Sequence, residues 1–170
     1  PLHIQVTAPD TEGMLGDADT LLTKIDPEVY VKVPVTMEGI KAIKQMKSRG
    51  IHVTGTAIYG KQQGFLAMEA GADYIAPYFN RMENMGLDSD DVIASLADMI
   101  DLYHYDTQIL AASFKNAGQI DRAFLAGAHT ATMDPAILKD VLTQPYITNA
   151  VDTFDSDWKS VFAEKTISEL

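Results

Sequence analysis

The residue with the clearest chemical potential is Lys32, a cation within the apolar run from Val29 to Val35. Burial in a low dielectric disfavours the ammonium form, so a lysine inside such a strand can hold a free amine near neutral pH. A free amine can attack a ketone and form a Schiff base. The alternative is an edge-strand lysine whose amine reaches solvent, which Pro34 favours slightly because proline in sheets prefers edges or bulges. The run alone leaves both interpretations open.

A second candidate segment, Gly55–Gln62, nearly matches the phosphate-binding pattern G-x-x-x-x-G-K-[ST]. Gln62 stands where that pattern requires a hydroxyl for Mg²⁺, and the bulky Ile58 and Tyr59 hinder a close wrap around phosphates. The dinucleotide fingerprint G-x-G-x-x-G is also absent. We therefore expect no nucleotide loop, and a non-catalytic phosphosugar- or nucleotide-binding module stays as an alternative to an enzyme.

Polar side chains follow two further apolar runs. Tyr78, Asn80 and Arg81 come at the end of one run, and Ser113 follows another. Arg81 offers paired donors for a phosphate or carboxylate, and Tyr78 can relay a proton if its hydroxyl meets a water. Because sites in parallel sheets and barrels form at the carboxyl ends of strands, these residues predict a site for an anionic ligand.

The sequence has no pattern typical of a metal centre or a reactive thiol. Cysteine is absent, and the four histidines show neither i,i+4 nor H-x-H spacing. We expect no metal and no cofactor. The acidic segment Asp88, Asp90 and Asp91 is expected to cap the helix that follows it.

Composition indicates one globular domain over residues 1–170, because 46% of the 170 residues are hydrophobic and 22% are charged. The 24 acidic and 13 basic residues give a net charge of -11, which repels nucleic acid and anionic lipid. No apolar run approaches the roughly 18 residues that span a bilayer, and no signal peptide is evident. We expect a soluble, cytoplasmic protein that binds neither nucleic acid nor membrane.

The elements that must position these residues alternate between strand and helix. The predicted strands are Leu2–Val6, Val29–Val35, His52–Ile58, Tyr74–Phe79, Ile109–Ala112 and Thr130–Met133. The predicted helices include Met37–Ser48, Gly60–Glu69, Asp90–Tyr103, Ala117–Ala126, Pro135–Leu142 and a terminal helix over 150–163. Strands that are apolar nearly throughout are typical of parallel sheets. The order predicts an α/β protein, and the pattern alone fits either a doubly wound sheet or most of an eight-stranded barrel.

Five segments of the chain together resemble the transaldolase family, and most of all its fructose-6-phosphate aldolase subgroup. The segments are Val31–Thr36, Gly55–Gly60 with Gln63–Gly64, Ala76–Arg81, Ala111–Lys115 and Phe154–Trp158. The resemblance extends from Leu2 to about Phe162. It implies a (β/α)8 TIM barrel with a C-terminal helix, in which the lysine strand is the fourth and roughly the first two strand–helix units are lacking here. We expect that roughly 50 further residues precede this segment in the intact protein or accompany it separately.

The resemblance also implies roles for individual residues. Lys32 would be the Schiff-base nucleophile, and Tyr78, with a water oriented by Gln5 and Thr56, would transfer protons. The substrate- and phosphate-binding residues would be Arg81, Ser113, Asn80 and Ala76. The implied reaction makes or cleaves a carbon–carbon bond between a dihydroxyacetone-type donor and an aldehyde such as glyceraldehyde 3-phosphate, without a cofactor.

Two positions favour an aldolase over the alternative, a transaldolase that transfers a dihydroxyacetone unit between sugar phosphates. Transaldolases usually carry glutamate where Gln5 stands and phenylalanine where Tyr78 stands. Family members also assemble as pentamers or decamers. The apolar stripe of the terminal helix, which includes Phe154 and Trp158, is therefore expected to pack on the barrel or on a neighbouring subunit of a homo-oligomer.

Overall fold

The apolar runs form one parallel sheet of six strands, ordered β1 to β6 along the chain, in a computed structural model that describes residues 1–170 without a gap. The strands are β1 (His3–Gln5), β2 (Tyr30–Pro34), β3 (Val53–Ile58), β4 (Tyr74–Pro77), β5 (Gln108–Ala111) and β6 (Thr130–Ala131). The helices between them are α1 (Thr11–Lys24), α2 (Met37–Ser48), α3 (Lys61–Glu69), α4 (Phe79–Asn84), α5 (Ser89–Tyr103) and α6 (Ala117–Leu125). The α/β prediction is confirmed, and the chain divides into the compact units Pro1–Met133 and Asp134–Leu170.

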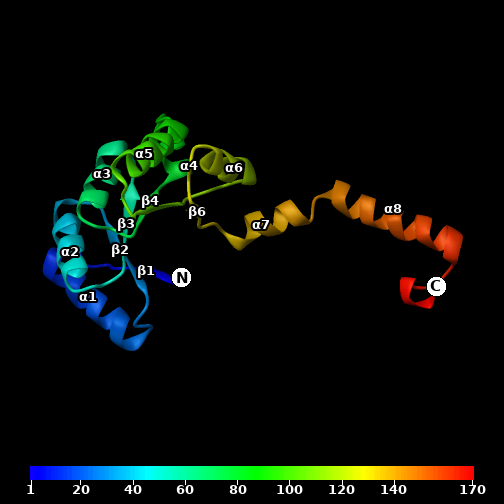
Figure 1. Cartoon of the computed structure of the whole chain (residues 1–170), viewed down its shortest axis with the longest axis horizontal. Coiled ribbons are helices and arrows are strands. Elements are labelled where there is room, and N and C mark those ends of the chain that lie inside the picture. The colour runs from blue at the N-terminus through cyan, green and yellow to red at the C-terminus, as the bar shows by residue number, and fades with distance from the viewer. The chain divides into compact units, whose positions relative to one another are not determined.

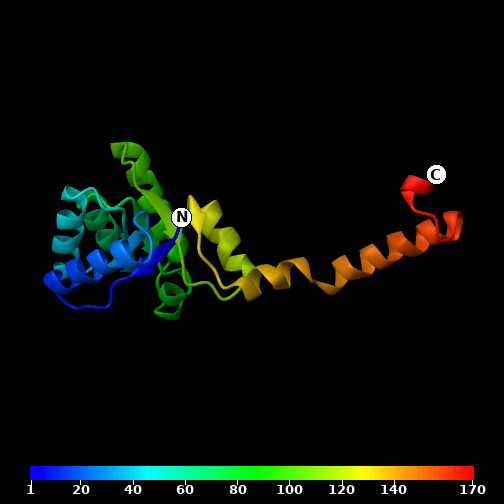
Figure 2. The ribbon, with the colours of Figure 1, turned by 90° about the horizontal axis from the view of Figure 1, so that it is seen from below.

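The sheet of the first unit curls into a half-barrel, and helices cover its convex face (Figure 1 and Figure 2). Helices α1, α2, α3 and α5 contact the strands directly. The side chains of β2 show the two faces, because Val31 and Val33 are fully buried whereas Lys32 between them is only half-buried. Successive residues of a strand point to opposite faces, and Lys32 therefore lies on the concave face.

Local capping explains where several helices begin and end. Thr36 accepts a hydrogen bond from the Gly39 amide at the start of α2, and Asp88 does the same for Asp91 at the start of α5, as predicted for this acidic segment. Gly50 and Gly127 adopt positive φ angles of 75° and 102° just after α2 and α6. Glycine suits this left-handed conformation, which lets the chain leave the helix.

Two elements differ from the sequence-based expectations. The strand predicted over Tyr74–Phe79 ends at Pro77, and Phe79 begins the short helix α4, where the Met82 amide donates to the Tyr78 carbonyl at 3.0 Å. Helix α1 was not among the predicted helices. Its sequence carries Gly13 and Gly16 and a weak apolar face, which lowers the helical signal.

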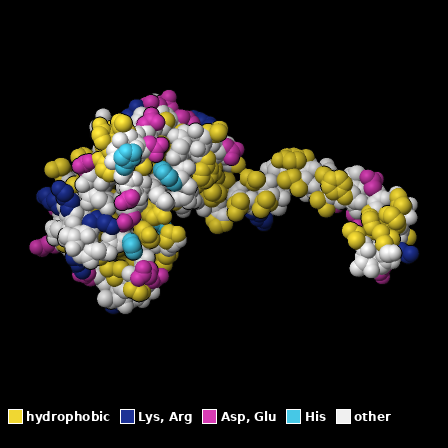
Figure 3. Space-filling view, in the orientation of Figure 1, with side chains coloured by type: hydrophobic (Ala, Val, Ile, Leu, Met, Phe, Trp, Pro, Cys, Tyr) yellow, Lys and Arg dark blue, Asp and Glu magenta, His cyan; other side chains and the backbone are white.

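The second unit consists of α7 (Pro135–Leu142), α8 (Pro145–Phe162) and the 3-10 turn Ile167–Glu169. The terminal helix predicted over 150–163 exists but begins earlier, at Pro145, where proline suits the first helical turn. The Trp158 ring lies 4.4 Å from the Phe162 ring, and its indole donates to the Lys165 carbonyl. Hydrophobic side chains line α7 and α8 (Figure 3), including Phe154, which is 69% exposed. None of the helices of the chain has the length and apolarity that a membrane crossing requires.

Candidate functional site

Lys32 occupies a central strand of the sheet. Its Cα atom pairs with that of Gln5 on β1 and with that of Thr54 on β3. Because β2 has a neighbour on each side, the interpretation of Lys32 as an edge-strand lysine is wrong. The strand holds the lysine by backbone pairing on both sides, which fixes the origin of its side chain.

The amine of Lys32 has no partner in the structure, since no hydrogen bond or ion pair involves it. Burial lowers the pKa of Lys32 below its usual 10.5. His3 on β1 is a close neighbour whose pKa is lowered to about 4, first by burial and then by the charge of Lys32. The His3 imidazole is therefore neutral near pH 7, adds no positive charge beside the lysine, and is held at 2.8 Å from the Thr54 hydroxyl.

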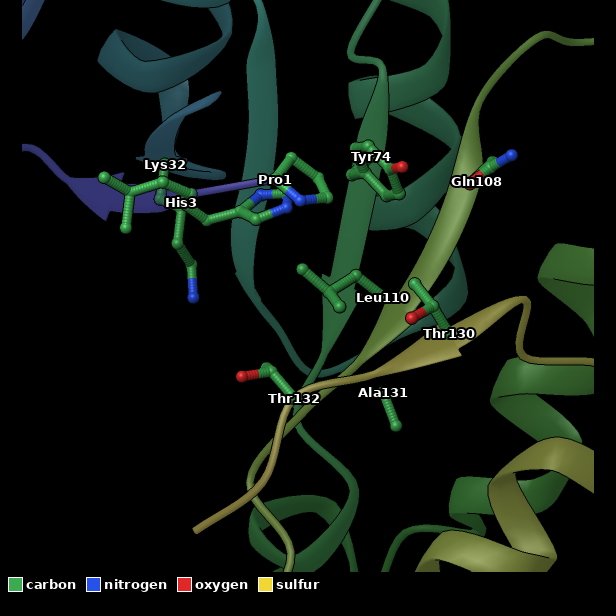
Figure 4. Close-up of a pocket in the computed structure, with 10 residues that line it drawn as sticks. Pro1, His3, Lys32, Tyr74, Gln108, Leu110, Thr130, Ala131 and Thr132 are labelled. Carbon is green, nitrogen blue, oxygen red and sulfur yellow. The ribbon is translucent and has the colours of Figure 1, made fainter. Parts of the chain in front are cut away.

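A cavity of about 510 Å³ opens on the concave face beside Lys32. His3, Tyr74, Leu110 and Thr132 are among its lining residues. Figure 4 shows the Lys32 amine and the Thr132 hydroxyl pointing into this hollow. Thr132 was not identified from the sequence as a candidate, although its place within the predicted strand Thr130–Met133 was a usable signal.

The Thr56 hydroxyl and the Tyr78 phenol meet on the same face, with their oxygens 3.1 Å apart. Thr56 is fully buried in β3. The register of β3 shifts between Gly55 and Ile58, where Ala57 adopts a positive φ of 56°, and the Tyr78 amide donates to the Ile58 carbonyl at 3.0 Å. This bulge places Thr56 and Tyr78 together, because it re-aims the end of β3 relative to β4.

Lys32 lies two residues nearer the amino end of its strand than the level of the Thr56–Tyr78 pair. Thr56 pairs with Pro34, which is two residues beyond Lys32 on the same face of β2. That spacing corresponds to about 6.6 Å along a strand, a distance that an extended lysine side chain can cover. No hydrogen bond links Lys32 to either hydroxyl, so the structure brings these residues to one face without a direct contact.

Arg81 lies beside the same phenol. Its guanidinium carbon is 4.7 Å from the centre of the Tyr78 ring, and its Nη1 atom donates to the Tyr59 hydroxyl at 3.1 Å. The Tyr59 and Tyr78 rings meet edge-on at 5.6 Å. The hydrogen bond to Tyr59 raises the pKa of Arg81, which stays a cation. Arg81 is exposed, and its remaining donors can therefore reach a ligand.

Tyr59 is a site residue that the sequence reasoning weighed only as an obstacle to a nucleotide loop. The residues Gly55–Ile58 lie within β3, and α3 begins at Lys61. Only Tyr59 and Gly60 connect the two elements, so the segment does not form the phosphate-wrapping loop that its pattern resembles.

Ser113 and Asn80 are joined through the backbone, because the Asn80 amide donates to the Ser113 carbonyl at 2.9 Å. Ser113 adopts a positive φ of 67°, which is rare for a residue other than glycine and costs conformational energy. Strain of this kind is concentrated at functional sites. Ala76 lies fully buried in β4.

Gln5 is a predicted site residue that the structure does not join to Thr56. It is opposite Lys32 in the strand register, but its exposed side chain makes no hydrogen bond with Thr56 or with any other residue. The structure contains no group of three or more histidine, cysteine, aspartate or glutamate side chains arranged to hold a metal ion.

The comparisons with known proteins agree with one another. A sequence model of the family described as Transaldolase/Fructose-6-phosphate aldolase matches residues 1–169. A probable fructose-6-phosphate aldolase of Streptococcus pneumoniae (strain ATCC 700669 / Spain 23F-1) is 48% identical over 157 residues, which cover 92% of this chain and 71% of that protein. A probable transaldolase of Chelativorans sp. (strain BNC1) is 38% identical over 158 residues, or 93% of this chain and 72% of that protein. The chain therefore belongs to the transaldolase/fructose-6-phosphate aldolase family.

Proposed function

We propose that this chain provides the active site of a Schiff-base aldolase with Lys32 as the nucleophile. The reaction makes or cleaves a carbon–carbon bond between a dihydroxyacetone-type donor and an aldehyde such as glyceraldehyde 3-phosphate. The observation that carries the proposal is a half-buried lysine without a partner on the concave face of the sheet. Burial lowers the pKa of this lysine. Schiff-base chemistry is general for the family to which the chain belongs.

The reaction begins when the neutral Lys32 amine adds to the donor ketone to give a carbinolamine. Loss of water forms an iminium ion, which withdraws electrons from the adjacent carbon. Loss of a proton from that carbon, or cleavage of its bond to the aldehyde carbon, then gives an enamine. The enamine carbon attacks an acceptor aldehyde in the synthetic direction, and hydrolysis of the product iminium releases the lysine.

Tyr78 is proposed to move the protons. Its phenol contacts Thr56 at 3.1 Å and lies on the face to which Lys32 points, so a water between them can exchange protons with the carbinolamine and the enamine. Gln5 stands opposite Lys32, where its amide can orient such a water in the substrate complex. The Arg81 guanidinium over the Tyr78 ring helps to hold the phenol in place.

Arg81 and Ser113 are proposed to hold the phosphate of the acceptor, with Asn80 and Ala76 lining the pocket. Arg81 is a cation with free donors, and Ser113 provides a hydroxyl at the end of the neighbouring strand β5. Arginine suits phosphate because its planar fork donates two parallel hydrogen bonds.

We also propose that residues 1–170 belong to one barrel domain of eight strands. The strands β1 and β6 are the open edges of the sheet, and barrel closure pairs such edges. A homo-oligomer in the cytoplasm is the expected setting, with the apolar side chains of α8 as a contact surface on the barrel or on a neighbouring subunit.

A transaldolase is the second candidate, favoured by the identity to the probable transaldolase of Chelativorans sp.. The residues Gln5 and Tyr78 argue for the aldolase. A non-catalytic phosphosugar- or nucleotide-binding module is the third candidate. It loses its main support because half of its supposed phosphate loop, Gly55–Ile58, is strand.

Cleavage of fructose 6-phosphate without an added acceptor separates these candidates. An aldolase releases glyceraldehyde 3-phosphate and free dihydroxyacetone, whereas a transaldolase turns over only when a second aldose takes the three-carbon unit. A binding module gives no product in either assay. Lys32→Met serves as the matched control, because its unbranched side chain fills similar space without an amine.

A further inference from the structure

Gln119 is a buried polar residue of α6, only 7% exposed, that joins two strand ends of the candidate site. Its side-chain oxygen accepts a hydrogen bond from the Lys115 amide at 2.8 Å. Its side-chain nitrogen donates to Asn80 Oδ1 at 3.0 Å and to the Glu83 carboxylate. The Gln119 amide thus connects the loop after β5 with helix α4, which follows β4.

The polarity of these partners leaves the Gln119 amide one orientation. The Lys115 backbone amide can only donate, and the Glu83 carboxylate, which pairs with Arg122, accepts. The Gln119 oxygen must therefore face Lys115, and its nitrogen must face Glu83 and Asn80. A reversed amide would set an oxygen against both the carboxylate and the Asn80 oxygen, and a nitrogen against the Lys115 N–H.

This orientation determines which end of Asn80 is free. Asn80 presents its oxygen to Gln119, so its amide nitrogen points elsewhere. That nitrogen makes no hydrogen bond within the chain. It is not fully buried, because no fully buried side-chain nitrogen or oxygen lacks a partner. Asn80 adjoins Arg81 in the sequence, and its backbone amide donates to the Ser113 carbonyl, so the residue that carries this free N–H donor is a neighbour of both proposed phosphate ligands.

Ion pairs hold Glu83, the carboxylate that accepts a hydrogen bond from Gln119 and so orients its amide. Arg122 of α6 donates from Nη1 to Glu83 at 2.6 Å and also pairs with Asp90 of α5. The Arg122 guanidinium lies 5.1 Å from the centre of the Phe79 ring, at the start of α4. Glu83 is therefore a fixed carboxylate, and the order of donors and acceptors from Arg122 to Asn80 is set by the fold.

We propose that Gln119 is a positioning residue that holds Asn80 with its amide nitrogen toward the acceptor phosphate. This role rests on the proposed aldolase function. It makes Asn80 a third donor for the phosphate, beside Arg81 and Ser113, and it makes the preference for phosphorylated aldehydes depend on a residue that touches no substrate.

Gln119→Glu tests the proposal, because a carboxylate of the same shape must accept where Gln119 donates. Asn80 then turns its nitrogen to position 119 and presents an oxygen to the phosphate. We expect the KM for glyceraldehyde 3-phosphate to rise about 10-fold or more, as for loss of a hydrogen bond to a charged group. The kcat and the kinetics with unphosphorylated glyceraldehyde should stay within about 2-fold. Gln45→Glu on the exposed face of α2 is the charge-matched control.

A double-mutant cycle with Asn80→Ala distinguishes positioning from a general structural role. If Gln119 acts through Asn80, Gln119→Glu changes the KM by less than about 2-fold once Asn80 is alanine. Equal effects of Gln119→Glu with and without Asn80, or equal effects on both aldehydes, overturn the proposal. If Gln119→Glu does not fold, Glu83→Gln with Gln119→Glu removes the carboxylate clash and still reverses Asn80, with the same expected rise in KM.

Titration with inorganic phosphate separates this proposal from the aldolase function. Wild-type protein should bind phosphate about 10-fold more tightly than Gln119→Glu, whether or not it turns over sugars. Wild-type protein that binds phosphate in this way but lacks aldol activity contradicts the proposed function alone. Equal phosphate affinity of the two proteins contradicts the role of Gln119 even if the aldol reaction is present.

Discussion

The hydroxyl of Thr56 in β3 lies 3.1 Å from the phenol oxygen of Tyr78, which follows β4, although the two residues are 22 positions apart. Thr56 is fully buried, and the bulge at the end of β3 brings it to the phenol. The contact fixes one side of the Tyr78 hydroxyl and leaves its other side for a water or a substrate atom. It is therefore the geometric basis for the proton transfer that we propose at this site.

Tyr78→Phe removes the proposed proton-transfer group while keeping the ring that Arg81 covers. We expect kcat for aldol cleavage to fall about 100-fold, as for the loss of a general acid or base. Steady-state kinetics with fructose 6-phosphate measure the change. Tyr103→Phe is the control, because Tyr103 is 62% exposed at the end of α5. A Tyr78→Phe enzyme with wild-type kcat would exclude the phenol from proton transfer.

Tyr59→Phe removes the hydroxyl that accepts a hydrogen bond from Arg81. Without it the guanidinium is held only by the face of the Tyr78 ring, so its aim toward the phosphate is less defined. We expect the KM for glyceraldehyde 3-phosphate to rise about 3- to 10-fold, less than for Arg81→Ala. Unphosphorylated glyceraldehyde provides the comparison in the same enzyme. A similar loss with both aldehydes would argue for a different role of Tyr59.

The pH dependence of Schiff-base formation reports the protonation of Lys32. Only the neutral amine attacks the ketone, so the rate rises as pH increases through the pKa of Lys32. Burial lowers this pKa below 10.5, which moves the rise to lower pH than for an exposed lysine. Gln5→Glu sets a carboxylate opposite Lys32, stabilises its ammonium form and should shift the rise to higher pH. Rapid trapping of the adduct across the pH range measures both profiles, and coincident profiles would contradict the expected coupling.

Gly39 of α2 packs closely against the end of β2, the strand that carries Lys32. A Cβ atom added there would lie 1.8 Å from the Pro34 carbonyl oxygen, so Gly39→Ala forces the helix away from β2. We expect a loss of at least about 2 kcal/mol in the free energy of unfolding, measured by denaturant titration. Gly16→Ala in α1 is the matched control, because no atom lies within 4 Å of the added Cβ. That substitution should stabilise by up to about 1 kcal/mol, and similar effects of the two would contradict the packing at Gly39.

The strands and most helices were predictable because their patterns are local. Met37–Ser48 has apolar residues at helical spacing and a threonine cap just before it, and the structure reproduces these bounds. The end of β4 was not predictable in the same way. Phe79 is apolar and aromatic like a strand residue, but in the structure the Met82 amide donates to the Tyr78 carbonyl and a helix begins at Phe79.

The positions of the site residues depend more on tertiary contacts than on the local sequence pattern. Lys32 was recognisable as a charge in an apolar run, but its central position follows from the strand order, which no local motif encodes. The contacts of Tyr59 with Arg81 and of Gln119 with Asn80 join residues 22 and 39 positions apart. The first contact forms only when α4 packs beside the connection between β3 and α3, and the second only when α4 packs beside α6, so residue type and spacing could not reveal them.

Reduction with borohydride in the presence of dihydroxyacetone tests the central claim most directly. The hydride converts the iminium on Lys32 to a stable secondary amine, which peptide mass spectrometry locates in the chain. The account predicts one three-carbon adduct on Lys32 in the wild type and none in Lys32→Met. Absence of the adduct in folded wild-type protein, or its appearance on another lysine in preference to Lys32, would contradict the account.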